Sequence, residues 1–216
     1  MHRNSQKRIY ERGTTVFVTS VTQGRIRYFE NDILAELFVR DLWIAKELKE
    51  IELFGYTVLP DHVHLLFLPV GEANYSEVMR SLKTNFSRDA NDILLNRLNN
   101  KRIPAGDVAP HRLQMAQTPR RLQMVRRHIQ LFLPELRRRL EDSPLHQGNI
   151  RRFVWQKSFR DHIIRDNRDF DNHLEYICNN AVRHGLTDEP GKWRHMWVLG
   201  MEEPKEHAAI LNSTMT

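Results

Sequence analysis

Two histidines separated by one residue, His62 and His64, have the spacing in this chain that points most directly to chemistry. They follow Pro60 and Asp61 in a run of β-branched and apolar residues that is typical of a strand. Residues two apart on a strand face the same side, so both imidazoles can bind one metal ion. For an arbitrary pair of this kind, two half-buried polar residues on a solvated sheet face are the more common outcome. A metal site built on these two histidines would also need a further ligand from another element.

The last predicted helix, from Asn167 to His184, offers a tyrosine and an asparagine for this purpose. Tyr176 and Asn180 are four residues apart and therefore lie on one side of a helix, with His173 one turn earlier. This polar side differs from the apolar face, which comprises Phe170, Leu174, Ile177, Cys178 and Ala181. The placement predicts a tyrosine hydroxyl that is available to a reactant, whereas a core tyrosine with a satisfied hydroxyl is the alternative.

Strands and helices that alternate along the sequence must position these groups. Two β-rich runs, 53–59 and 62–69, are separated by only two residues, which predicts an antiparallel hairpin. The other predicted elements are a strand at 14–21, a helix capped by Asn31 or Asp32, a helix capped by Ser76 with its apolar stripe from Met79 to Ile93, a strand at 153–164, and the last helix, capped by Asp166 or Asn167. This order predicts an α+β fold: a ferredoxin-like antiparallel sheet with helices on one face, plus a basic helical insert.

One domain of residues 1–216 is expected, with a basic, largely helical insert at 96–150 and a tail at 198–216 of unknown role. In the insert, Thr118 and Pro119 predict a helix start, Pro134 predicts a kink, and apolar positions from Leu122 to Leu140 form one face. The net charge of the chain is +6, whereas residues 101–152 hold 12 basic and 4 acidic residues, a balance of +8 that leaves −2 elsewhere. The local excess predicts an anionic partner, with a solvated spacer as the alternative.

Composition narrows the class of protein further. No stretch approaches the ~18 consecutive apolar residues that span a bilayer, and residues 1–12 lack the apolar core of a secretory signal. We therefore expect a cytoplasmic protein without a membrane partner. The single cysteine, Cys178, excludes an internal disulfide and a multi-cysteine zinc site. A metal ion would be bound by imidazole, carboxylate or amide groups.

Five segments together resemble a known family. They are Phe17–Ser20 (FVTS), Tyr56–Leu66 (YTVLPDHVHLL), Met79–Lys83 (MRSLK), Trp155–Asp166 (WQKSFRDHIIRD) and His173–Leu186 (HLEYICNNAVRHGL). In this order, and from about residue 14 to residue 193, they resemble the REP-associated tyrosine transposases, within the HUH superfamily of single-strand DNA transposases with one catalytic tyrosine.

The resemblance implies that Tyr176 is the nucleophile, that His62 and His64 are paired metal ligands, and that Asn180 completes the metal site. It implies a metal-dependent endonuclease and transposase that cleaves and rejoins DNA at REP-like hairpins through a 5′-phosphotyrosine intermediate. The expected cofactor is Mg²⁺ or Mn²⁺, because both ions suit a site that leaves positions open for phosphate, although imidazole also suits zinc. The expected partner is single-stranded or hairpin DNA, and a monomer is favoured over a dimer. A catalytically inactive hairpin-binding protein and an HUH replication initiator or relaxase are the alternatives.

Two features depart from the family pattern. The tyrosine helix reads Cys178, Asn179, Asn180, Ala181, where relatives usually have an aromatic residue before the asparagine and a proline after it. Helical phase favours Asn180 over Asn179, because Asn179 is out of line with Tyr176. The second departure is the long basic insert, and the DNA-binding candidates lie on it and on the second helix: Lys83, Arg88, Arg126, Arg127, Arg137, Arg138 and Arg139.

Overall fold

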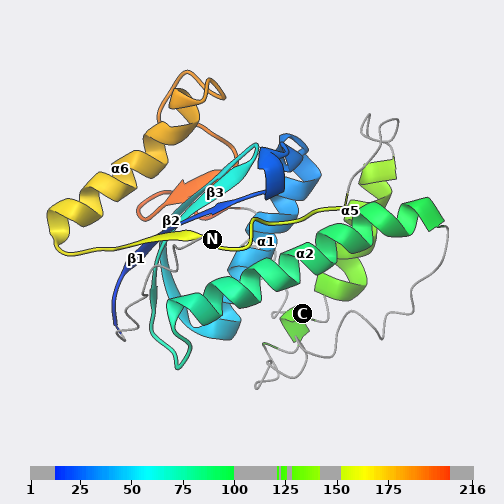
Figure 1. Cartoon of the computed structure of the whole chain (residues 1–216), viewed down its shortest axis with the longest axis horizontal. Coiled ribbons are helices and arrows are strands. Elements are labelled where there is room, and N and C mark those ends of the chain that lie inside the picture. The colour runs from blue at the N-terminus through cyan, green and yellow to red at the C-terminus, as the bar shows by residue number, and fades with distance from the viewer. Residues whose placement is uncertain (1–12, 100–120, 122, 126–127, 142–151, 205–216) are drawn as a thin grey trace, which may run out of the picture.

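A five-stranded antiparallel sheet forms the centre of the protein (Figure 1). The computed structural model describes residues 13–99, 121, 123–125, 128–141 and 152–204. The strand order is β4-β1-β3-β2-β5, so that β1, β3 and β2 lie inside the sheet and β4 and β5 at its edges. The strands are β1 (Val16–Val21), β2 (Ile51–Leu59), β3 (His62–Pro69), β4 (Arg160–Ile163) and β5 (Met196–Val198). The main helices are α1 (Asp32–Lys49), α2 (Tyr75–Asn99), α5 (Leu133–Glu141) and α6 (Asn167–Arg183).

Helices cover both faces of the sheet, and the alternation along β3 decides which core each residue enters. Val63 and Leu65 belong to the large core that the sheet shares with α1 and α2. Leu66 joins Phe17 and Ile177 in a smaller core beneath α6. The predicted α+β class and antiparallel sheet are confirmed. The layers differ in one respect from the expectation of helices on one face, because α6 lies on the face opposite to α1 and α2 (Figure 1).

The helices begin at residues whose side chains satisfy free backbone N–H groups. The Asn31 side chain accepts hydrogen bonds from the backbone of Ile33 and Leu34, as predicted for α1. The Asp166 side chain caps α6 in the same way. The cap predicted for α2 was wrong: Asn74 rather than Ser76 receives the backbone N–H of Glu77, and the Glu77 carboxylate accepts the backbone N–H of Asn74. This reciprocal pair is a capping box.

The predicted β2–β3 hairpin and β1 are confirmed, whereas the edge strands differ from the prediction. The strand expected at 153–164 is limited to β4, and before it Trp155 makes only an isolated bridge to Thr22. Phe153 and Trp155 are buried in the large core, so their β-like composition reflects packing rather than strand pairing. β5, which pairs with β2 through Gly55, was not predicted. Three residues are too few for a periodic pattern.

The basic segment is helical where the structure describes it. A π turn at His128–Phe132 leads into α5, and Val125, Phe132, Leu136 and Leu140 are buried, in agreement with the predicted apolar face. Pro134 is the second residue of α5, directly after the π turn, and proline has no N–H for the regular helical pattern. The predicted irregularity therefore lies beside the proline. The predicted helix start at 118–119, Leu122, Arg126 and Arg127 are outside the described residues, as is the tail beyond 204.

Two arginines of α5 bind acidic residues of the large helical layer. Arg137 contacts Asp92 of α2 at 2.5 Å, and Arg139 contacts Glu36 of α1 at 2.8 Å. Burial raises the pKa of Asp92 even though the Arg137 guanidinium acts to lower it. These two arginines therefore tie α5 to its neighbours, while Arg138 is exposed. Within the described part of the chain, every helix is too short or too polar to cross a membrane.

We predict that Arg137→Gln lowers the free energy of unfolding by about 1–3 kcal/mol, because it leaves the largely buried Asp92 carboxylate without its guanidinium partner. Urea denaturation would measure this loss. Arg138→Gln is the matched control, because an exposed substitution is expected to change stability by less than about 0.5 kcal/mol. Equal effects of the two substitutions would contradict a role of the Arg137–Asp92 pair in holding α5.

Candidate active site

The two histidines of β3 lie on the face of the sheet that α6 covers. In the sheet register, Thr19 of β1 and Thr57 of β2 flank His64 on either side. His62 and His64 are both buried, and their ring centroids are 4.9 Å apart. His64 also stacks on the ring of Phe17 at 5.3 Å. The predicted common face of the two imidazoles is confirmed, and the alternative of a solvated sheet face is wrong, because α6 covers the pair.

Hydrogen bonds to Nδ1 orient both imidazoles. The Nδ1 atom of His62 lies 2.5 Å from the Asp61 carboxylate, which can only accept, so this nitrogen carries the proton and Nε2 is left as an acceptor. The Nδ1 atom of His64 lies 2.8 Å from the Thr19 hydroxyl, which leaves its Nε2 available too. Such bonds to the second ring nitrogen are typical of metal-binding histidines.

The electrostatics keep both rings neutral and Asp61 ionised. Burial lowers the pKa of His62, and burial together with the neighbouring His62 and His184 lowers the pKa of His64 to about 3. Burial acts to raise the pKa of Asp61, but hydrogen bonds from His62 and Arg25 outweigh it, and the pKa falls below its ordinary value. Neutral imidazole is the form that binds metal ions.

α6 brings Tyr176 to His64 and His184 to His62, and Asn180 is placed by the helical repeat between Tyr176 and His184 on the same side of the helix. The Tyr176 ring meets the His64 ring edge to face at a centroid distance of 5.1 Å. Asn180 is buried, whereas the Asn179 amide donates to the backbone carbonyl of Glu175. The sequence-based preference for Asn180 therefore agrees with its position. The predicted apolar face of the helix packs into the small core, where Ile177 is buried, and the adjoining side with Tyr176 and Asn180 also faces the sheet.

Two buried polar atoms on these residues have no hydrogen-bond partner in the part of the chain that the structure describes. They are Nε2 of His64 and Oδ1 of Asn180. The hydroxyl of Thr57, the cross-strand neighbour of His64, is also buried without a partner. A buried polar atom without a partner costs about 1–3 kcal/mol, so folded proteins rarely keep one without a ligand, an ion or water. Imidazole nitrogen and amide oxygen are both donors to divalent ions, and the residues therefore fit a metal site.

Two further groups at the end of α6 were not predicted as parts of the site. The His184 ring lies 5.3 Å from the His62 ring, and the guanidinium carbon of Arg183 lies 5.4 Å from the centre of the Tyr176 ring. Their spacing of seven and eight residues from Tyr176 places them on the same side of the helix, which is the signal that could have identified them.

The predicted DNA-binding residues are not part of this cluster. Lys83 and Arg88 are on α2, across the sheet from α6, and Lys83 donates to the backbone carbonyls of Gln156 and Ser158. Of the arginines predicted on the insert, Arg137 and Arg139 form the ion pairs described above. In the structure, Arg137 and Arg139 thus join α5 to its neighbours, whereas Arg138 is exposed.

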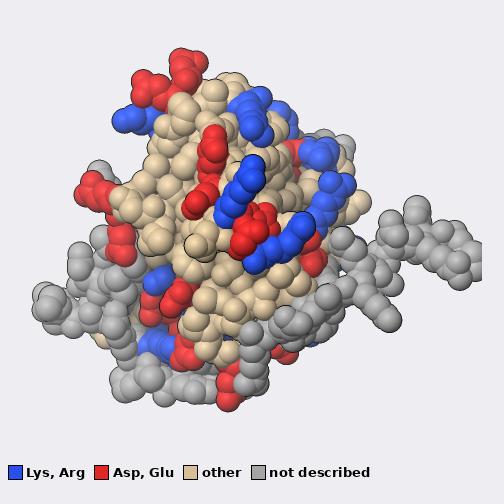
Figure 2. Space-filling view, turned by 90° about the vertical axis from the view of Figure 1, so that its left-hand side faces the viewer, with Lys and Arg blue, Asp and Glu red and all other residues tan. Residues whose placement is uncertain are grey.

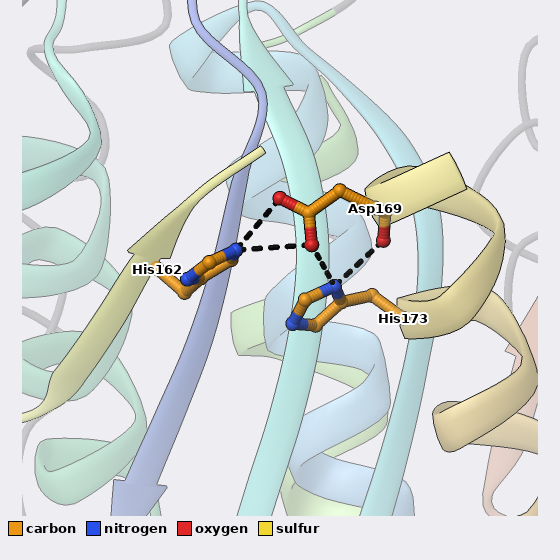
Figure 3. Close-up of side chains that lie close together, drawn as sticks. All are labelled: His162, Asp169 and His173. Atoms are coloured by element: carbon orange, nitrogen blue, oxygen red, sulfur yellow. Dashed lines mark hydrogen bonds and ion pairs between the residues drawn. The ribbon is translucent and has the colours of Figure 1, made fainter. Parts of the chain in front are cut away.

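A second cluster ties the first turns of α6 to the edge strand β4 (Figure 3). The Asp169 carboxylate receives Nε2 of His162 at 2.8 Å and the backbone N–H of Arg165 at 3.1 Å. Nδ1 of His173 lies 2.8 Å from the backbone carbonyl of Asp169, which can only accept, so this nitrogen carries a proton. The three side chains lie close enough to hold a metal ion, but these hydrogen bonds already occupy the facing atoms. The cluster is better explained as an anchor of α6, since His173 packs on Phe17 at 4.6 Å.

Comparisons with known proteins agree with the family resemblance seen in the motifs. Residues 14–102, which contain both histidines of β3, match the family described as transposase IS200 like. A REP-associated tyrosine transposase of Haemophilus influenzae is 26% identical over 191 residues, which cover 88% of this chain and 82% of that protein. A REP-associated tyrosine transposase of Escherichia coli is 38% identical over 40 residues, or 18% of this chain and 24% of that protein. The predicted resemblance to these transposases is confirmed.

A solved structure of a REP-associated tyrosine transposase bound to a REP hairpin has a TM-score of 0.48 with this chain and 20% sequence identity. The likeness covers 86% of this chain and 76% of that chain.

We predict that Asp169→Asn lowers the free energy of unfolding by about 1 kcal/mol at neutral pH, because the carboxylate accepts from His162 and Arg165. The hydrogen bond from His162 is the main reason that the pKa of Asp169 is lowered. The stabilisation is therefore present above the ordinary pKa of 3.8 and is lost as the pH falls through the lower value of the folded state.

Denaturation at several pH values would check this: the difference between the wild-type protein and Asp169→Asn should shrink below about pH 4. Asp171→Asn, an exposed change on the same helix, serves as the control and should cost little at any pH. A difference that grows on acidification would contradict the assignment.

Proposed function

We propose that this relative of the REP-associated tyrosine transposases is a metal-dependent enzyme that cleaves and rejoins single-stranded DNA at REP-like hairpins. One observation carries the proposal: the unpartnered Nε2 of His64 and Oδ1 of Asn180 are buried in the cluster where Tyr176 meets the His64 ring. The names of the relatives supply the substrate class. The reaction class follows from a phenol beside a set of metal-binding atoms.

Tyr176 is the proposed nucleophile. Its oxygen attacks phosphorus, a bond from oxygen to phosphorus forms, and the bond from phosphorus to the 3′ oxygen of the preceding nucleotide breaks. The phenolic proton is released, the leaving 3′ oxygen takes up a proton, and the product is a 5′-phosphotyrosine with a free 3′ hydroxyl. The reverse attack by a 3′ hydroxyl rejoins a strand without an external energy source, because the bond energy is kept in the phosphotyrosine.

A phenol is a weak nucleophile at neutral pH, so its attack on phosphorus needs help from neighbouring groups. The Arg183 guanidinium lies over the Tyr176 ring and places a positive charge beside the developing phenolate. His62, His64 and Asn180 would hold the metal ion. When bound, a divalent ion neutralises phosphate charge and stabilises the leaving oxygen. Mg²⁺ or Mn²⁺ suits this task best, because each keeps coordination positions for phosphate oxygens.

Residues around the ligands restrict how they can move. Thr19 and Asp61 hold Nδ1 of His64 and His62, and Arg25 in turn contacts Asp61 at 2.9 Å. Such supporting bonds keep the imidazoles in one orientation, and their loss commonly reduces metal affinity by about 10- to 100-fold. All of these groups come from the same chain as Tyr176, which favours a monomer as the active unit.

We predict that Tyr176→Phe abolishes the covalent protein–DNA adduct while DNA binding is retained, because only the attacking hydroxyl is removed. The measurement is denaturing electrophoresis after incubation with a single-stranded hairpin oligonucleotide and Mn²⁺. Tyr28→Phe is the control, because that hydroxyl donates to the Arg152 carbonyl instead of lying in the site. An adduct formed by Tyr176→Phe at the wild-type rate would show that another residue is the nucleophile, and a wild-type protein without any adduct would support the inactive hairpin-binding alternative.

We also predict that His64→Ala and Asn180→Ala each reduce Mn²⁺ affinity and adduct formation by about 100-fold or more, because each removes a proposed ligand. Calorimetric titration with Mn²⁺ measures the affinity directly. Asn179→Ala is the neighbouring control and should behave as the wild type, since its amide serves only the helix backbone. Unchanged Mn²⁺ binding in both ligand variants, or full activity in EDTA, would rule out this metal site.

A further inference from the structure

A basic groove lies between α2 and residues 152–159, which run side by side (Figure 1). It consists of two adjoining hollows of about 820 and 580 Å³ that share Lys83, Thr84 and Lys157. Buried Phe153 and Trp155 anchor the 152–159 segment in the large core. The groove is thus on the α2 side of the sheet and is separate from the Tyr176 cluster beneath α6.

The walls of the groove are fixed to each other. Lys83 donates to the backbone carbonyls of Gln156, at 2.9 Å, and Ser158, at 3.3 Å. Asn91 makes two reciprocal bonds with the backbone of Phe153, at 2.7 and 3.0 Å. Because these bonds join α2 to the segment at two separate points, a ligand would meet a preformed groove and would not have to order it.

The lining of the groove is strongly positive. The described residues that line the two hollows include five cations, Arg80, Lys83, Arg88, Arg152 and Lys157, against one acid, Glu77. Figure 2 shows one face of the molecule, where Lys and Arg side chains lie among Asp and Glu side chains. The excess of cations in the lining of the groove favours the binding of an anion.

The groove is also connected to the candidate active site. The backbone N–H of Gln156 bonds to the carbonyl of Val21, and Trp155 bridges to Thr22. Thr22 in turn donates to the carbonyl of Asp61, whose carboxylate holds His62. The middle of the 152–159 wall, at Trp155 and Gln156, therefore lies at the end of the sheet where the β2–β3 turn presents His62. A DNA strand that left the site over this end of the sheet would pass close to the groove.

We propose that this groove binds the single-stranded part of the DNA substrate next to its hairpin, an inference that rests on the proposed function. A single strand is an extended polyanion, and basic grooves that track its backbone are typical of proteins that bind it. Hydroxyl and amide side chains such as Thr84, Ser87 and Gln156 line the same groove and offer hydrogen bonds to phosphate or base. Phe159, half-buried at the far end, adds an aromatic ring to the lining of the groove.

The test uses a labelled hairpin oligonucleotide with and without a ten-nucleotide single-stranded extension on each side, titrated by fluorescence anisotropy over a range of salt. The variant Arg80→Gln/Lys157→Gln removes two exposed cations of the groove and leaves the Lys83 bonds in place. The extensions should strengthen binding to the wild type, and the double variant should lose that gain while its affinity for the bare hairpin stays unchanged. The slope of log affinity against log salt should fall by up to about 1.4, or about 0.7 for each phosphate contact.

Lys46→Gln/Lys49→Gln removes the same charge from the end of α1 and is the matched control, expected to bind both oligonucleotides as the wild type does. Equal melting temperatures would show that both double variants are folded. The proposal is overturned if the groove variant keeps the gain from the extensions, if it loses affinity for both oligonucleotides equally, or if extensions made of RNA bind more tightly than DNA. Binding is measured in EDTA, so a failure of the Tyr176 adduct experiment would contradict the proposed reaction without affecting this result.

Discussion

The packing of α6 against the ring of Phe17 is the interaction on which the candidate active site depends. The ring contacts His64 of the sheet and both His173 and Tyr176 of the helix, at centroid distances of 5.3, 4.6 and 5.7 Å. Aromatic pairs prefer definite orientations, so one buried ring can fix the separation of two elements. The paired histidines come from β3 and the other candidates from α6. The cluster therefore exists only while this packing holds, and Phe17 supports the chemistry without taking part in it.

Gly55 of β2 lets α6 and β5 come this close to the sheet. A Cβ atom at this position would lie 3.0 Å from Cγ1 of Val198 and 3.2 Å from Cδ1 of Ile177, both in the small core beneath α6. A side chain would therefore push the helix or the edge strand outward. The close packing of α6 on the sheet that buries Ile177 also buries Asn180, three residues later. The burial of the Asn180 amide oxygen therefore depends on Gly55 of β2. The contact that packs α6 on the sheet therefore also sets the position of Asn180, a proposed metal ligand.

Local geometry explains why the site residues could be predicted from the sequence while their surroundings could not. The two-residue period of a strand puts His62 with His64, and the period of about 3.6 residues of a helix puts Tyr176 near Asn180, before any tertiary contact forms. The predicted apolar face of α6 does pack on the sheet, where Ile177 joins Phe17 and Leu66. Apolar periodicity alone could not show that the adjoining side with Tyr176 also faces the sheet, because that contact depends on the imidazoles of β3. The edge strands depended on partners distant in sequence: β5 forms only because β2 is available, and buried Trp155 resembled a strand residue although it makes a single bridge.

The position of the positive charge on the folded protein also could not be predicted from the sequence. Counted along the sequence, the excess lies at residues 101–152 and the remainder is slightly acidic. In the folded chain, Arg137 and Arg139 of that basic segment are held by Asp92 and Glu36, so part of its charge is neutralised in packing. The five cations that line the groove meanwhile come from α2 and the 152–159 segment, which are far apart in the sequence. Because electrostatic attraction decays within about 10 Å in salt, a DNA strand is attracted by cations that are grouped on the surface and not by the net charge of a sequence segment. The fold, more than the composition of the insert, thus decides where DNA can bind.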